Sequence, residues 1–168
     1  EVLGICNGYG EAGPRALGNR SIIARADSKK LAEKVSMYHK GREWYRPIAP
    51  VLLKEFLSYF TAEPRNLELG RYMLTDYSIR EERQDEIAGV VHNDGTARIQ
   101  VLEDKTVNTF LFDLLSYLAQ HFQIRALINT SFNGKGEPIV HTYQQAEESA
   151  RNMNLDGVVV GGQFVSLP

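Results

Sequence analysis

The sequence predicts one domain of mixed α/β or α+β architecture, in which helices flank an open, mixed β-sheet. Short apolar runs of strand length alternate with longer segments in which apolar residues recur at helical spacing. Polar residues repeatedly follow the apolar runs, at the strand ends where ligands bind in such sheets. With 168 residues, of which 43% are hydrophobic, the chain can bury one substantial core. We therefore treat residues 1–168 as a single domain.

The first half of the chain predicts three strands and two helices. Ser28 is suited to cap the longer helix, because its hydroxyl can accept a hydrogen bond from a free backbone N–H. Leu31, Val35 and Tyr38 recur at helical spacing behind it. The predicted elements are, in order, a strand over 2–6, a glycine-rich loop over 7–14, a strand over 21–24, the helix from 28 to about 38, a strand over 49–53 and a short helix over 54–60.

The second half predicts further short strands around one long helix. Apolar side chains recur at helical spacing over residues 107–122, the clearest amphipathic pattern in the chain. Thr142 is suited to cap a last helix. The predicted elements are, in order, strands over 72–78 and 87–91, a turn over 93–96, an alternating strand over 98–101, the helix over 107–122, a short strand over 127–128, a turn over 134–136, a helix to about 153 and a strand over 157–161.

Composition excludes several classes of protein. A net charge of −2 and a pI near 6.1 argue against a general nucleic-acid binder, which needs cations spread over a face. Cys6 is the one cysteine, so neither an intramolecular disulfide nor a cysteine-based zinc site is expected. The four histidines lack metal-ligand spacing, and we predict no metal ligand from the protein itself. No apolar run reaches membrane-spanning length and no signal peptide is evident, so we expect a cytoplasmic protein.

Cations gather in one part of the chain. From Arg15 to Arg46 there are nine Lys and Arg residues against three Asp and Glu residues, whereas the rest carries ten against eighteen. Arginine offers a fixed charge and a planar fork that matches phosphate or carboxylate. The glycine and proline turns beside these arginines favour a polyphosphate or acyl-phosphate ligand of nucleotide size.

Each of these residues also has a purely structural interpretation. The Gly-x-Gly-x-x-Gly pattern over residues 8–13 is weak alone, since no helix-forming sequence follows it directly. One guanidinium could merely stack on Trp44 or Tyr45, and Arg98 could pair with Asp94. The small polar side chains after residue 128 could build turns by bonding their own backbone, or could contact ribose, adenine or a carboxamide: Asn129, Ser131 and Asn133. No nucleophile elbow is present, so we expect catalysis by electrostatics rather than by a covalent nucleophile.

Four long motifs, in order, resemble the C-terminal domain of the O-carbamoyltransferases that include nodulation protein U and the tobramycin carbamoyltransferase. They are GPRALGNRSI at 13–22, REWYRPIAP at 42–50, DGTARIQ at 94–100 and NTSFNGKGEPI at 129–139. The resemblance implies a YrdC-like fold, with an open, twisted mixed sheet. It also implies that the domain condenses carbamoyl phosphate with Mg-ATP into carbamoyl adenylate, releasing pyrophosphate. A Kae1-like N-terminal domain would then pass the carbamoyl group to a hydroxyl acceptor.

The resemblance also assigns roles by position. Lys40 and Arg46 are expected nearest the reacting acyl phosphate, as the catalytic cations. The expected nucleotide, phosphate or carbamoyl contacts are Arg15, Arg20, Arg42, Arg98, Asn129, Ser131 and Asn133. Tyr9, Gly10 and Ala12 depart from the Arg, Met and Phe expected in the first loop, which leaves its side-chain contacts open.

Two other functions remain open from the sequence. A nucleotide- or RNA-binding YrdC-like module without carbamoylation activity would keep the same groove. An adenylating enzyme for bicarbonate or another small carboxylate would keep the fold and change the substrate. Because residues 2–6 already have the pattern of a buried strand and the first residue is not methionine, we expect the domain to belong to a longer protein that supplies the Kae1-like domain.

Overall fold

The computed structural model describes residues 1–43, 45–62 and 67–168, and a seven-stranded mixed sheet organises the fold. The strand order is β6-β3-β7-β2-β1-β8-β9. The strands are β1 (Val2–Cys6), β2 (Arg20–Arg25), β3 (Ala49–Leu53), β6 (Gln100–Leu102), β7 (Ala126–Ser131), β8 (Gly157–Val160) and β9 (Gln163–Ser166). β1 runs parallel to β8 and β3 parallel to β6, while the other neighbours are antiparallel. This confirms the predicted fold class.

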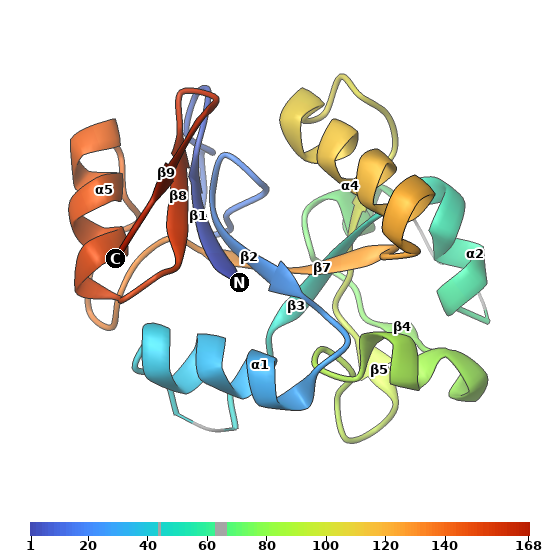
Figure 1. Ribbon diagram of the computed structural model, residues 1–168. Helices are drawn as coiled ribbons and strands as arrows, with labels where there is room; N and C mark the ends of the chain where they lie inside the picture. Colours follow the sequence, from blue (N-terminus) through green and yellow to red (C-terminus); the bar gives the residue numbers. More distant parts are fainter. Residues whose placement is uncertain (44, 63–66) are drawn as a thin grey trace.

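Helices cover both faces of the sheet (Figure 1). α4 (Thr109–Phe122) lies over one face, and α1 (Lys29–Glu33) and α5 (Tyr143–Asn152) lie over the other. The smaller elements are the π-helix η1 (Lys34–His39), the 3₁₀ helices η2 (Lys54–Phe56) and η3 (Glu81–Ile87), the helices α2 (Leu57–Phe60) and α3 (Leu67–Arg71), and a separate two-stranded antiparallel sheet of β4 (Tyr77–Ser78) and β5 (Thr96–Ala97).

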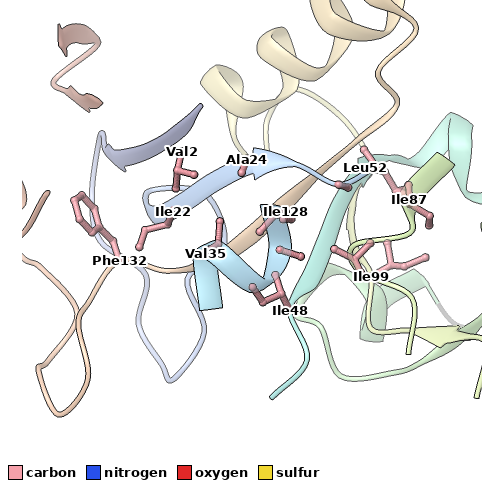
Figure 2. Close-up of a cluster of buried hydrophobic side chains, with 14 of the residues drawn as sticks. Val2, Ile22, Ala24, Val35, Ile48, Leu52, Ile87, Ile99, Ile128 and Phe132 are labelled. Atoms are coloured by element: carbon pink, nitrogen blue, oxygen red, sulfur yellow. The ribbon is translucent and has the colours of Figure 1, made fainter. Parts of the chain in front are cut away.

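Alternation along the strands divides the core into two layers. Ile22 and Ala24 of β2 point into the α1 and α5 layer, where they meet Ile128 and Val35 (Figure 2). Ile23, the residue between them, points into the α4 layer with Leu111 and Leu115. Because successive side chains of a strand face opposite sides, this phase decides which face each polar residue of the sheet occupies.

The predicted caps are confirmed. The Ser28 hydroxyl accepts from Leu31 N at 3.2 Å, and Thr142 forms a capping box with Gln145. The helix behind Ser28 changes character, however, because its second half is the π-helix η1. The extra residue per turn buries Ser36 and His39 and leaves Tyr38 64% exposed, so Tyr38 does not share one face with the buried Val35, although its spacing predicted that it would.

Several predicted strands have other conformations. Residues 87–91 are the end of η3 and a turn, because Gly89 lies so close to the backbone that an added Cβ would sit 2.7 Å from Ser28 O. Within 72–78, Met73 has a φ of 56° and Tyr77–Ser78 alone form a strand. Residues 98–101 are split between an irregular pair and β6. β7 is longer than predicted, and the exposed strand β9 was not predicted.

Candidate active site

Three polar side chains of β6 and β7 lie on the α4 face of the sheet. Leu127 packs against α4, and Asn129 and Ser131 follow it at intervals of two residues, on the same face. Gln100 shares this face for the same reason, since it precedes Leu102 of the α4 layer by two residues. The structure thus gathers two predicted site residues beside α4, within the strand rather than in a loop after it.

Lys40 fastens the end of β7 to the end of η1. Its side chain is 2% exposed, and its Nζ donates to the backbone oxygens of Ser131 and of Asn133, the latter at 2.7 Å. Asn133 Oδ1 at 3.2 Å and Ser131 Oγ at 3.4 Å also lie within hydrogen-bond distance. Ser131 Oγ in turn donates to Asn133 Oδ1 at 2.6 Å. One hydrogen-bond network therefore joins Lys40, Ser131 and Asn133, which are predicted from the sequence to belong to the same site.

The same burial changes the acidity of Lys40. Desolvation, assisted by the positive charge of Arg42 and opposed by Glu137, lowers the pKa of Lys40 from 10.5 to about 7. The lysine can therefore exchange its proton near neutral pH while its neighbours keep their charge.

Four arginines form a chain of electrostatic neighbours next to Lys40, and we call them the cation cluster: Arg15, Arg42, Arg46 and Arg98. Arg42 Nη2 donates to Ser131 Oγ at 3.4 Å, and burial together with the charges of Arg46 and Arg98 lowers the pKa of Arg42. Burial and then the charge of Arg15 lower the pKa of Arg98. Like charges are held close together here, which favours binding of a multivalent anion.

The members of the cation cluster differ in their partners. Arg46 Nε pairs with Glu43 Oε2 at 2.8 Å, and Glu43 also meets Lys135 Nζ at 3.4 Å. Arg98 Nε is buried without a hydrogen-bond partner, and Arg15 has no hydrogen bond or ion pair within the described ranges. The alternative pairing of Arg98 with Asp94 is not seen, because Asp94 Oδ1 accepts from the Thr96 N and Oγ1 instead. Trp44, on which a guanidinium could stack, lies outside the described residues.

Arg20 is separated from the cation cluster. It precedes Ile22 by two residues, so its side chain enters the opposite layer of the sheet. There it is 5% exposed, and its two terminal nitrogens donate to the backbone oxygens of Asn7, Gly8, Asn19 and His141 at 2.8–3.3 Å. These bonds hold the glycine-rich loop and leave Arg20 facing away from Asn129 and Ser131.

Asn129 takes part in a buried relay of amides. Its Nδ2 donates to Ala16 O at 3.2 Å and to Gln100 Oε1, while Gln100 Nε2 donates to Leu17 O at 2.8 Å. Asn129 Oδ1 is left buried without a partner. Gln100 was not among the predicted site residues, although its place in the alternating segment 98–101 could have indicated a side chain on the same face as Arg98.

A cavity lies elsewhere in the described part of the molecule. It encloses about 690 Å³ between α1, residues 45–48 and residues 84–95. Ala32, Ile48 and Val90 in its wall belong to the layer opposite α4, and Arg46 lines it. We place the site at the cation cluster, because several fixed positive charges act on one another there. Arg46 belongs to the cluster and also lines the cavity.

The described parts of the chain lack two kinds of feature. No group of three or more His, Cys, Asp or Glu residues is arranged to hold a metal ion. No described helix has the length and apolar character needed to cross a membrane.

The chain matches several known proteins. It is 37% identical to the nodulation protein NolO of Bradyrhizobium diazoefficiens over 160 residues, which cover 95% of this chain and 29% of NolO. It is 36% identical to the 3'-hydroxymethylcephem-O-carbamoyltransferase of Streptomyces clavuligerus, with the same two coverages. The structure of HypF from T. kodakarensis shares the fold, with a TM-score of 0.58 and 16% identity over 90% of this chain and 18% of HypF.

The relatives NolO and the cephem carbamoyltransferase are thus more than three times as long as the region matched. The family model described as "Carbamoyltransferase C-terminus" matches residues 1–166, nearly the whole chain. The protein therefore belongs to the carbamoyltransferase C-terminus family.

Proposed function

We propose that this domain forms carbamoyl adenylate from carbamoyl phosphate and ATP, as the first half-reaction of an O-carbamoyl transfer. The single observation that carries the proposal is the cation cluster, in which like charges are held together beside unpaired polar groups. Family membership supports carbamoyl transfer as the overall chemistry. A Kae1-like domain would transfer the carbamoyl group to the acceptor hydroxyl. ATP and carbamoyl phosphate are both metabolites of the cytoplasm, where we place the reaction.

The atoms balance if the carbamoyl donor loses its phosphate. Water attacks the phosphorus of carbamoyl phosphate, and the bond between phosphorus and the carbamoyl oxygen breaks. The products are carbamate and orthophosphate. A carbamate oxygen then attacks the α-phosphorus of ATP, and the bond to the β-phosphate oxygen breaks to release pyrophosphate. One orthophosphate and one pyrophosphate are therefore expected for each carbamoyl adenylate.

The residues of the site suit this reaction. Two polyanions must approach each other, and fixed guanidinium groups offset their repulsion and the charge that develops on departing pyrophosphate. Arg15 and Arg98 are the members of the cation cluster for which no side-chain hydrogen bond or ion pair occurs in the described ranges. Lys40 orders the backbone at Ser131 and Asn133, and Asn129 Oδ1 supplies an acceptor for an N–H of the carbamoyl group or of adenine. Mg²⁺ would arrive with ATP, held by phosphate oxygens rather than by a carboxylate cluster.

The test is carried out with the 168-residue chain, ATP, magnesium and carbamoyl phosphate. Pyrophosphate and orthophosphate should be released together, and mass spectrometry should detect carbamoyl adenylate in the bound fraction. Bicarbonate and acetyl phosphate serve as alternative acyl sources, and an electrophoretic shift assay with RNA tests the binding module. Tight ATP binding with no adenylate from carbamoyl phosphate, or preference for bicarbonate, contradicts the proposal.

A further inference from the structure

The loop that carries Arg15 is held in place by a carboxylate of its own. We call residues 11–19 the Arg15 loop. Glu11 Oε1 accepts hydrogen bonds from Leu17 N at 2.8 Å and from Asn19 N at 2.7 Å. One carboxylate oxygen thus closes the loop into a ring, with two charge-assisted bonds to the backbone just after Arg15.

The sheet holds the same loop from the other side. Gln100, which is 0% exposed, donates to Leu17 O, and Asn129 donates to Ala16 O. Leu17 therefore has its N–H bound by Glu11 and its carbonyl bound by Gln100. A main-chain position with both polar groups fixed has little freedom, and Ala16, which directly follows Arg15, is held through its carbonyl by Asn129.

Arg15 itself does nothing to keep the loop closed. No partner of its guanidinium occurs in the described ranges. Its positive charge repels the positive charge of Arg98 and lowers the pKa of Arg98. Repulsion between two partly desolvated cations favours an open loop when no anion is bound. The bonds to Glu11, Gln100 and Asn129 work against this repulsion.

We propose that Glu11 and Gln100 are positioning residues, which hold Arg15 close to Arg98 before the anionic ligand arrives. This rests on the proposed function in so far as Arg15 binds an anion, but not on carbamoyl chemistry. A preformed pair of cations binds a polyphosphate without first ordering the loop, whereas a loop freed from Glu11 or Gln100 has to be ordered on binding.

The first experiment measures the binding of inorganic pyrophosphate by calorimetry. Glu11→Ala should weaken pyrophosphate binding about tenfold, because part of the binding free energy is then used to order the Arg15 loop. Glu11→Gln keeps a carbonyl acceptor and removes a negative charge, so it should bind at least as tightly as wild type. Glu148→Ala, an exposed residue of α5 on the opposite face, makes the same charge change and should leave binding unchanged. Tighter binding by Glu11→Ala than by Glu11→Gln overturns the proposal.

A double-mutant cycle separates positioning from general stability. If Glu11 and Gln100 act through Arg15, then Glu11→Ala and Gln100→Glu should have little effect on pyrophosphate affinity once Arg15→Ala is present. Amide hydrogen exchange gives a second readout: Leu17 and Asn19 should be protected in wild type and in Glu11→Gln, and exchange faster in Glu11→Ala. Equal losses with and without Arg15, or unchanged protection, contradict the proposal.

The outcomes distinguish this inference from the proposed function. Coupling between Glu11 and Arg15 in pyrophosphate binding, without any adenylate from carbamoyl phosphate, upholds the positioning role and overturns the function. Adenylate formation without such coupling does the reverse. If wild type binds neither pyrophosphate nor ATP, both are overturned.

Discussion

Arg20 and Arg46 are both predicted from the sequence to face the anionic ligand, Arg20 as a phosphate contact and Arg46 as a catalytic cation, but their surroundings in the structure differ. Arg20 is 5% exposed, and its terminal nitrogens donate to four backbone carbonyls. The Arg46 side chain is 57% exposed, and its Nε pairs with the carboxylate of Glu43. Backbone carbonyls cannot move away without unfolding the loop, whereas a surface carboxylate can yield to a stronger anion. A buried arginine with all its terminal donors used holds structure, and a half-exposed one is free to bind.

The largest effect is expected from removing Arg20. Arg20→Ala leaves several buried carbonyls without donors and should lower the free energy of unfolding by about 3 kcal/mol. For a domain of this size that corresponds to a fall in Tm of roughly 6 to 12 °C, measurable by calorimetry or urea titration. Arg20→Lys should restore little, because an ammonium cannot reproduce the fork. A stable Arg20→Ala variant with lost ATP affinity would place Arg20 among the ligand contacts and break the comparison.

A smaller effect, on binding rather than folding, is expected at Arg46. Loss of one charge-assisted contact of roughly 1.5–3 kcal/mol should weaken ATP or carbamoyl phosphate binding by about one to two orders of magnitude in Arg46→Ala. Arg46→Lys should also bind poorly if the contact is a bidentate fork. The midpoint of urea unfolding should stay at the wild-type value in both variants. Wild-type affinity in Arg46→Ala would sink the assignment of Arg46 to the site.

Lys40 sharpens the comparison, since it is buried like Arg20 and close to the ligand site like Arg46. With a pKa lowered to about 7, Lys40 is charged below that pH, so ATP affinity should fall as the pH rises through about 7. In the unfolded chain the pKa returns to about 10.4. Between these values the unfolded state binds more protons, so the contribution of Lys40 to stability should increase with pH over this window.

The control for Lys40 is Lys40→Met, which keeps the length of the side chain. Both pH dependences should disappear in this variant, when ATP affinity and urea unfolding are compared at about pH 6 and about pH 9. If the wild-type and Lys40→Met profiles have the same shape, another group is responsible for the titration.

The sequence predicts the parts of the fold in which local signals agree with tertiary packing. Strands β1, β2 and β3 and helices α4 and α5 have both an apolar pattern and a clear boundary, and all were predicted. Residues 87–91 were misassigned because a run such as IAGVV satisfies a strand pattern, while the close approach of Gly89 to Ser28 O depends on another segment. β9 has no buried alternation, so pairing with β8 alone defines it.

For the candidate site, the sequence predicts which residue types take part, but it does not predict to which face of the sheet each side chain points. The segments around Lys40, Ser131 and Asn133 were predicted together and form one network. Arg20 and Asn129 were also predicted to belong to one site. Their side chains enter opposite layers of the core, because Arg20 shares a face of β2 with Ile22 and Asn129 shares a face of β7 with Leu127. Glu11 carries no local signal, since a single glutamate in a glycine-rich loop is usually solvated. Its bonds to Leu17 and Asn19 become visible when the loop is folded.

The π-helix η1 makes chain length a determinant of the site. An α-helix turns about 100° per residue, so the wide turns of Lys34–His39 rotate everything after them relative to a regular helix. That rotation is what carries His39 and Lys40 inward and turns Tyr38 outward. A regular α-helix over the same six residues would turn Lys40 away from Ser131 by about 100°, the rotation of one α-helical residue. Deleting one residue between 34 and 39 as well would return Lys40 close to its present direction. The number of residues in this short segment and the width of its turns are thus matched to each other.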